Sequence, residues 1–291
     1  MGEDRIIEGR ILKGIGGFYY VYDKQKRVHE CKARGRFRNE NITPLPGDFV
    51  TFSPEKGESQ GYIEEILPRK NQLVRPQVVN VDQVMIIVAV KDPKPDLLLI
   101  DKLIISAERV GILPILVINK SDLASEVDIE SIMAQYTPSY EVLVTSAKKG
   151  EGLSEIKKRL RGNTTCFAGQ SAVGKSSILN ALFKELGLET GILSKKTARG
   201  KHTTRHAELI RPYRVNGMVV DTPGFSLLKN KGIEPATLSH YYPEMREYLG
   251  DCKFSSCLHT HEPKCAVKQA VAEGKINEAR YERYKQLMET L

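Results

Sequence analysis

Residues 169–176 read Gly-Gln-Ser-Ala-Val-Gly-Lys-Ser, which is the residue pattern of a loop that wraps a phosphate group. The two glycines let the backbone curl around an anion, so that its N–H groups point inward. Lys175 can then offer an ammonium group to the β and γ phosphates of a nucleotide, and Ser176 can offer a hydroxyl to Mg²⁺. The nucleotide contacts expected here come from Gly169, Gln170, Ser171, Ala172, Val173, Gly174, Lys175, Ser176 and Ser177.

A second motif has the residue types that read a guanine base. Asn-Lys-Ser-Asp follows directly after the apolar run 113–118, which is typical of a buried strand. The carboxylate of Asp122 can accept from N1–H and from the 2-amino group of guanine, a donor pair that adenine lacks. Asn119 is expected to brace the loop, and the stem of Lys120 to cover the base. We expect base contacts from Asn119, Lys120, Ser121 and Asp122, and from Ser146, Ala147 and Lys148, where a backbone N–H would meet the guanine oxygen.

A third group of residues would serve Mg²⁺ and the γ phosphate. Asp221 is the carboxylate expected near the ion, and Gly224 is the hinge expected to sense the γ phosphate. Thr203 or Thr204 would complete the magnesium shell. The position after the Asp-x-x-Gly motif holds Phe225, whose ring cannot orient an attacking water as the glutamine of Ras-like enzymes does. We therefore expect slow intrinsic hydrolysis, with another group placing the water.

These motifs occur in an unusual order, because the guanine-reading motifs precede the phosphate loop. In an ordinary GTPase the phosphate loop comes first. Joining the original termini and opening the chain elsewhere can leave a site intact, since termini often lie close together on the surface. The sequence therefore predicts a circularly permuted enzyme that hydrolyses GTP.

Three cysteines and a histidine gather late in the chain, in the spacing Cys-x4-Cys-x-His-x5-Cys. Four soft ligands with no free position for water suit a closed, structural zinc site. We predict one zinc ion per chain, held by Cys252, Cys257, His259 and Cys265. His261 could replace His259, although its spacing is less favourable. A set of buried free cysteines is the alternative without a metal.

Composition and charge limit the classes of protein to which the chain can belong. The chain has 291 residues, of which 41% are hydrophobic, and this leaves room for two or three domains. No apolar run approaches eighteen residues, and the acidic N-terminus lacks a secretory stretch, so we expect a cytoplasmic protein without a membrane partner.

The net charge of +8 includes a basic stretch in the first part of the chain. Its cations lie near several aromatic residues, a combination that favours a nucleic-acid surface over a merely solvated strand face. The basic residues are Lys24, Lys26, Arg27, Lys32, Arg34, Arg36 and Arg38, and the aromatic ones Phe18, Tyr19, Tyr20, Tyr22 and Phe37.

The hydrophobic pattern divides the chain into three parts. Residues 1–70 contain five short strands between turns, which predicts an RNA-binding β-barrel of the oligonucleotide-binding (OB) kind, with an SH3-like barrel as the alternative. Residues 71–228 alternate strand and helix, as an α/β GTPase domain requires, and the motifs follow strand ends. Residues 229–291 are predicted to form a mostly helical zinc-binding domain.

In this combination of motifs the whole chain resembles the RsgA family of circularly permuted GTPases, also called YjeQ or YloQ. The resemblance implies GTP hydrolysis to GDP and phosphate, stimulated by the 30S ribosomal subunit, and a role in late maturation of that subunit. It also implies a barrel that touches 16S ribosomal RNA, and it makes His202, beside the two threonines, a candidate catalytic residue. One departure is Ala172, where the family's loop usually carries glycine.

We expect a monomer that binds GTP and GDP. Two other functions stay open at this point. The chain could be a nucleotide-gated RNA-binding assembly factor whose hydrolysis is incidental, and its RNA affinity would then depend on salt with negligible stimulated turnover. It could also be a permuted GTPase that acts on another ribonucleoprotein, such as the large subunit.

Overall fold

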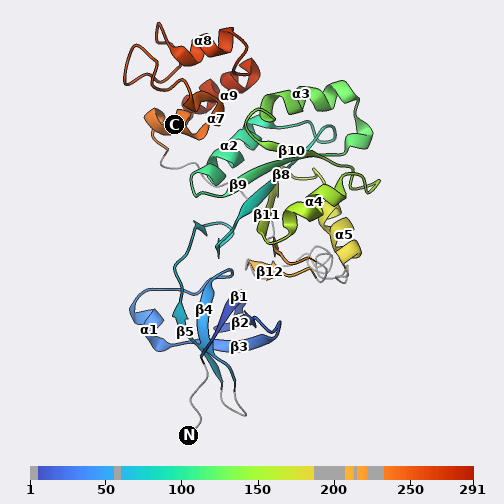
Figure 1. Ribbon diagram of the computed structural model, residues 1–291, viewed down its shortest axis with the longest axis vertical. Coiled ribbons are helices and arrows are strands. Elements are labelled where there is room, and N and C mark those ends of the chain that lie inside the picture. Colours follow the sequence, from blue (N-terminus) through green and yellow to red (C-terminus); the bar gives the residue numbers. More distant parts are fainter. Residues whose placement is uncertain (1–5, 56–59, 187–206, 213–214, 222–232) are drawn as a thin grey trace. The chain divides into compact units, whose positions relative to one another are not determined.

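The computed structural model describes all residues except 1–5, 56–59, 187–206, 213–214 and 222–232 (Figure 1). The chain divides into two compact units, each built from segments far apart in the sequence. One unit comprises Met1–Val84, Ile156–Phe167 and Leu179–Ser226, and the other Met85–Glu155, Ala168–Ile178 and Leu227–Leu291. Across the described residues, no helix combines the length and the apolarity that a membrane crossing requires.

The first part of the chain forms a closed five-stranded barrel with the strand order β1-β2-β3-β5-β4. β3 and β5 run parallel, and the other neighbouring strands run antiparallel. Closing the sheet leaves no unpaired edge strand, and this Greek-key arrangement confirms the expected OB-like fold. The elements are β1 (Ile7–Ile15), β2 (Phe18–Asp23), β3 (Val28–Ala33), α1 (Gly35–Asn39), β4 (Phe49–Ser53) and β5 (Gly61–Ile66).

The barrel core consists of side chains that alternate inward along the strands, among them Ile11, Val21 and Phe52. Phe37 of α1 also belongs to this core and is 5% exposed. It therefore packs the helix onto the barrel and is not available for stacking on RNA. Here the structure differs from the sequence interpretation, which counted Phe37 among the aromatic residues of a nucleic-acid surface.

The middle of the chain forms a six-stranded sheet in the order β10-β9-β8-β11-β13-β12. β9 and β10 are parallel, as are β11 and β13, whereas β12 runs antiparallel to β13. The strands are β8 (Gln83–Ala89), β9 (Leu113–Asn119), β10 (Glu141–Val144), β11 (Thr164–Gly169), β12 (Glu208–Ile210) and β13 (Met218–Asp221). The accompanying helices are α2 (Leu97–Glu108), η1 (Ser121–Leu123), α3 (Glu126–Tyr136), α4 (Leu153–Leu160) and α5 (Lys175–Leu186). A short hairpin of β6 (Gln72–Leu73) and β7 (Val78–Val79) precedes the sheet.

Each strand that precedes a predicted motif ends at the first residue of the motif or within two residues of it. β9 ends at Asn119, β11 at Gly169 and β13 at Asp221, while β10 ends two residues before Ser146. Carboxyl ends of strands are where open α/β sheets bind their ligands. The α/β fold class predicted from the alternating pattern is confirmed.

The C-terminal part is mostly helical, as predicted. It contains η2 (Pro235–Tyr241), α7 (Pro243–Arg246), α8 (Ala266–Ala272) and α9 (Glu278–Met288). Tyr242, Met245 and Tyr284 form its core, and Ile105 of α2 packs into the same cluster.

Two buried arginines of α9 hold this part against α2 and α3. Arg280 and Arg283 both donate to the carboxylate of Asp101, at 2.8 and 2.5 Å, and Asp101 is fully buried. Tyr136 of α3 donates to the same carboxylate over 2.9 Å, and Arg280 also pairs with Glu244. The two guanidinium groups and the carboxylates of Asp101 and Glu244 give the buried cluster a net charge near zero. Buried charges are tolerated when they are paired in this way.

Candidate nucleotide site and metal cluster

Asn119 joins two loops of the expected nucleotide site. Its side-chain Nδ2 donates to the carbonyl oxygen of Val173 over 2.8 Å, and its Oδ1 accepts from the backbone N–H of Ala147 at 3.2 Å. The residue is 2% exposed and lies at the end of β9. The phosphate loop and the 146–148 loop are therefore both fixed to a single side chain.

Two glycines of the phosphate loop stand where no side chain fits. A Cβ on Gly174 would come within 2.3 Å of the Asn119 amide nitrogen, and one on Gly169 within 2.2 Å of the Ile87 carbonyl oxygen. Both glycines have positive φ, at +96° and +132°. Ala172 also has a positive φ, of 62°, which explains why glycine would be the easier residue at this position.

Lys175 lies over its own loop. Its Nζ donates to the carbonyl oxygens of Gly169 and Gln170, at 2.8 and 2.5 Å, and burial lowers its pKa. These carbonyls are neutral acceptors, so an anionic phosphate in the loop would compete for the ammonium group and raise that pKa. The hydroxyl-bearing side chains of the loop, Ser171, Ser176 and Ser177, are open to solvent at the surface.

The carboxylate of Asp122 is oriented by a hydroxyl from the third motif. Ser146 Oγ donates to Asp122 Oδ1 over 2.6 Å, and this hydrogen bond is the main reason that the pKa of Asp122 is lowered. Ser146 is itself fully buried, and its Oγ also accepts from the backbone N–H of Lys149. The arrangement leaves Asp122 ionised and fixed in direction, which a group that reads paired N–H donors requires.

The remaining base-site residues lie beside this pair. Lys120 has a left-handed backbone, with φ of 63°, and its ammonium group donates to the carbonyl oxygen of Asp92. Ser121 begins η1, and its backbone N–H donates to the carbonyl oxygen of Thr145. The structure therefore brings together Asn119, Lys120, Ser121, Asp122, Ser146, Ala147, Val173 and Gly174.

Only some of the expected magnesium and catalytic residues lie among the described residues. Asp221 is the last residue of β13, and it lies opposite Glu208 of β12 in the register of the hairpin. His202, Thr203, Thr204, Gly224 and Phe225 lie outside the described residues.

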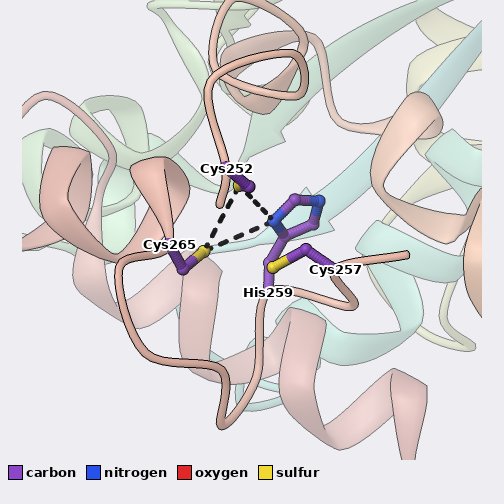
Figure 2. A group of neighbouring side chains, drawn as sticks. All are labelled: Cys252, Cys257, His259 and Cys265. Carbon is purple, nitrogen blue, oxygen red and sulfur yellow. Dashed lines mark hydrogen bonds between the residues drawn. The ribbon is translucent and has the colours of Figure 1, made fainter. Parts of the chain in front are cut away.

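The Cys/His cluster is assembled as a tetrahedral metal site requires. The four ligand atoms of Cys252, Cys257, His259 and Cys265 all lie within 4.8 Å of one another, and their side chains point into one space (Figure 2). Cys252 Sγ is 3.9 Å from Cys265 Sγ, and His259 Nδ1 is 3.5 and 3.4 Å from the same two sulfurs. Tetrahedral zinc would separate two sulfurs by about 3.8 Å and sulfur from nitrogen by about 3.6 Å. The donors therefore fit zinc in both type and spacing.

The loop that carries His259 is held by side chains that the sequence analysis did not single out. Glu262 accepts hydrogen bonds from the backbone N–H groups of Leu258, Thr260 and His261, at 2.7 to 3.1 Å. Burial alone would raise the pKa of Glu262, but these backbone donors outweigh burial and bring the pKa to about 2. The sequence signal that points to Glu262 is the presence of a carboxylate inside the Cys/His run.

Two tyrosines of α9 fix the same loop. Tyr281 donates to the carbonyl oxygen of His259 and Tyr284 to that of Leu258, both over 2.8 Å. His261, the alternative ligand, is exposed, whereas His259 is 3% exposed and burial lowers its pKa. A lowered pKa favours the neutral imidazole that binds metals. The geometry thus favours His259 over His261.

Comparison with known proteins agrees with this geometry. Residues 66–231 match the model of the RsgA GTPase family, and residues 8–63 match the RsgA N-terminal domain. Relatives named "Small ribosomal subunit biogenesis GTPase RsgA" include one from Bacillus velezensis, 46% identical with 98% of this chain and 97% of the relative covered, and one from Bacillus subtilis, 44% identical with 97% and 96% covered.

Two solved structures resemble this chain over nearly its whole length. YjeQ from Thermotoga maritima has a TM-score of 0.86 at 38% identity, with 99% of each chain covered. YloQ, described as a circularly permuted GTPase, has a TM-score of 0.84 at 37% identity, with 100% of this chain and 96% of YloQ covered. With a family model that covers more than half of the chain and relatives aligned over nearly all of it, the protein belongs to the RsgA GTPase family.

Proposed function

We propose that the protein binds GTP with Mg²⁺, hydrolyses it to GDP and phosphate, and acts on the 30S ribosomal subunit late in its maturation. The observation that carries the proposal is the double contact of Asn119 with Val173 and Ala147. It fixes a phosphate loop to a guanine-reading motif despite their reversed order in the chain. The names of the relatives, which mention the small ribosomal subunit and a GTPase, support the choice of partner.

In this proposal the base is read by Asp122. The Ser146 hydroxyl fills one acceptor position of the carboxylate and leaves the others for the N1–H and 2-amino donors of guanine. The backbone N–H of Lys148 is assigned to the guanine oxygen, because those of Ser146 and Ala147 already donate to Glu151 and Asn119. The stem of Lys120 covers the ring. Adenine would leave the remaining acceptor positions of Asp122 without donors once the base covers them, and this is the physical basis of the selectivity.

The phosphates lie in the loop from Gly169 to Ser177, where backbone N–H groups and the Lys175 ammonium meet them. Ser176 and Asp221, with Thr203 or Thr204, supply oxygen donors, and Mg²⁺ prefers such hard ligands. The glycine cradle of Gly169 and Gly174 and this donor set fit a Mg²⁺–nucleotide complex. When bound, the ion would neutralise charge that develops on the transferred phosphoryl group.

Water placement is assigned to His202. Phe225 stands where Ras-like enzymes carry the glutamine that orients the attacking water. Its phenyl ring can neither donate a hydrogen bond to a water molecule nor accept one from it. His202 precedes the two threonines, and its imidazole can hold the attacking water when the 30S subunit is bound. We expect His202→Ala to retain nucleotide and subunit binding while losing about a hundredfold or more of the stimulated rate.

The barrel is proposed to contact 16S rRNA through its basic stretch between Lys24 and Arg38. Several cations there lie over aromatic rings, such as Lys32 over Phe18 and Arg34 over Tyr62, at 5.0 and 4.4 Å. Cations held over half-buried rings suit a phosphate-binding face. Zinc held by Cys252, Cys257, His259 and Cys265 would keep the C-terminal part folded.

We further propose that the chain works as three domains, residues 1–70, 71–228 and 229–291, in a monomeric cytoplasmic protein. The ranges of the two family models, 8–63 and 66–231, support the first two boundaries.

One experiment tests the function. The GTP hydrolysis rate of the full chain is measured alone and with purified 30S or 50S subunits, beside co-sedimentation with a non-hydrolysable GTP analogue or GDP. We expect stimulation by 30S only, and retention that is stronger with the analogue. Lys175→Ala should abolish both effects, whereas Lys275→Ala, which removes a lysine paired with Glu273, should leave them unchanged. Retention without turnover would favour a nucleotide-gated RNA-binding factor, and stimulation by 50S another particle.

A further inference from the structure

A pocket of about 320 Å³ is formed by barrel residues together with residues of β11, of β13 and of the segments next to them. All of these segments belong to the same compact unit. The volume lies at the small end of the range of roughly 300–1,000 Å³ that is usual for small-molecule sites. None of the lining residues belongs to the phosphate loop or to the guanine-reading motif. The pocket is therefore separate from the nucleotide site.

The pocket has an excess of positive charge. Four of the residues that line it are cations: Arg10, Lys24, Lys26 and Arg211. Asp23 is the one carboxylate among the lining residues, and it is already hydrogen-bonded to Arg27 and His29. Lys24 is ion-paired with Glu8 over 2.6 Å. The other three cations have no ion-pair partner in the described part of the chain.

The carboxylates near Arg10 do not supply that partner. Burial lowers the pKa of Arg10 to about 10, although Asp48 and Asp82 act in the opposite direction. Each of these two carboxylates is held by a cation of its own, Asp48 by Arg69 over 2.7 Å and Asp82 by Lys70 over 3.2 Å. Arg10 is thus a guanidinium group that has lost much of its water without a direct counter-charge.

Arg10 is fixed in position by neutral acceptors. Its Nε donates to the carbonyl oxygen of Gly47 and its Nη2 to that of Asn80, at 3.2 and 2.9 Å. Its Nη1 donates to Thr164 Oγ1 over 2.8 Å. These contacts order the side chain but leave its charge unbalanced. A cation that is ordered in advance binds an anion without a further loss of side-chain entropy.

Arg211 is positioned by an aromatic residue of the barrel. Its Nη1 donates to the hydroxyl of Tyr22, and its guanidinium group lies over the ring, 4.9 Å from the ring centre. Because this hydroxyl acts as an acceptor, its own hydrogen stays available for donation to a ligand. The fork of a guanidinium group matches the spacing of two phosphate oxygens.

We propose that this pocket binds a phosphate group, held by the guanidinium groups of Arg10 and Arg211, the hydroxyl of Tyr22 and the ammonium group of Lys26. A phosphate accepts several hydrogen bonds at once and supplies the negative charge that the three cations lack. The pocket has the volume of roughly ten water molecules, so a sugar attached to the phosphate also has room. The phosphate can therefore belong to an RNA chain or to a free nucleotide.

The test measures binding of small probes to the full chain saturated with GDP and Mg²⁺, so that the phosphate loop is occupied. The probes are uridine monophosphate, uridine and tetrauridylate without a terminal phosphate, and ligand-detected NMR gives their dissociation constants. We expect uridine monophosphate to bind, uridine not to bind, and the affinity to fall as salt increases. A tetrauridylate affinity above that of the monophosphate would identify RNA as the source of the phosphate, and the reverse order a free nucleotide.

Substitutions locate the probe in the pocket. Arg211→Gln should weaken binding of uridine monophosphate about tenfold or more, because charge-assisted hydrogen bonds are lost. Arg211→Lys keeps the charge without the fork and should weaken it less. Lys26→Gln removes an exposed cation, so we expect a loss of about two- to fivefold. Arg38→Gln is the matched control, since Arg38 is an exposed barrel cation that does not line the pocket, and it should leave the affinity unchanged.

Three outcomes would overturn the inference. The first is uridine that binds as tightly as its monophosphate, since the phosphate would then not be recognised. The second is an equal affinity for the monophosphate in Arg211→Gln and Arg38→Gln. The third is a monophosphate that binds only without GDP, which would place it in the phosphate loop and leave the proposed function intact. A chain that does not bind GDP would contradict the proposed function, and the pocket would then be tested without GDP.

Discussion

The side-chain amide of Asn119 donates to the carbonyl oxygen of Val173 over 2.8 Å, across 54 positions of sequence. A Cβ on the neighbouring Gly174 would lie 2.3 Å from the same amide nitrogen. The guanine motif and the phosphate loop therefore constrain each other through close contact. Circular permutation has left this contact in place, because β9 and β11 still end at the same edge of one sheet.

Asn119→Asp should weaken GTP binding without changing base preference. The substitution keeps the size of the side chain but turns a buried donor into an acceptor that faces the Val173 carbonyl oxygen. An unmade buried hydrogen bond of this kind corresponds to about a tenfold to hundredfold loss of affinity. Titration of GTP and xanthosine triphosphate against the variant measures both quantities. Wild-type affinity for GTP would show that the contact does not support the loop.

Asp122→Asn should behave differently at the same site. The carboxylate that accepts two guanine donors becomes an amide, whose NH2 group can donate to the additional carbonyl of xanthine. We expect GTP affinity to fall about thirtyfold or more and the affinity for xanthosine triphosphate to rise. A variant that loses GTP without gaining xanthosine triphosphate would mean that Asp122 supports the loop and does not read the base.

The zinc cluster offers a matched pair of histidines. His259→Ala removes the buried imidazole that lies 3.4 and 3.5 Å from two cysteine sulfurs, so we expect the zinc content to fall from about one to near zero per chain. His261→Ala removes an exposed ring two residues away and should retain zinc. Metal content by atomic absorption and hydrogen exchange beyond residue 233 test this together. Equal zinc contents in the two variants would contradict the ligand assignment.

The elements and motifs were predictable because their signals are local. Apolar runs such as 113–118 end directly at polar motifs, and turn residues separate five short strands in the first part of the chain, so strands form where these local patterns predict them. The side-chain pairs that join distant segments had no such signal. Lys13 and Glu208, which form an ion pair over 3.1 Å, read as ordinary surface charges, and nothing near Asp101 in the sequence indicates that two arginines of α9 contact it. Such pairs follow from tertiary packing and not from periodicity.

Asp101→Asn should strongly destabilise the attachment of α9. It would leave Arg280 and Arg283 buried with reduced compensation, and breaking a buried ion pair typically costs about 3–5 kcal/mol. Glu108→Gln, in the same helix, disrupts a pair with the half-exposed Arg246 and should change stability by about 1 kcal/mol or less. Urea unfolding monitored by hydrogen exchange in α9 provides the measurement. Similar losses in both variants would contradict the special role of Asp101.

Acid should loosen the barrel through Asp23. Burial alone would raise its pKa, but hydrogen bonds from the Arg27 backbone, His29 and the Arg27 side chain outweigh burial and bring the pKa to about 2, below the ordinary 3.8. Because the folded-state pKa lies below the unfolded one, the carboxylate stabilises the barrel above about pH 4, and this contribution is lost between about pH 4 and 2.

Asp23→Asn should therefore expose the barrel amides to exchange at pH 7 and make little difference near pH 2, where the wild-type carboxyl is itself protonated. Hydrogen exchange of β2 and β3 in the full chain, compared at the two pH values, isolates the barrel from any acid-induced loss of metal at the C-terminal end. Glu8→Gln is the control, because Glu8 pairs with Lys24 at the exposed surface and should alter exchange at neither pH. An Asp23→Asn effect of equal size at pH 7 and pH 2 would show that the side chain acts through its shape and not through its charge.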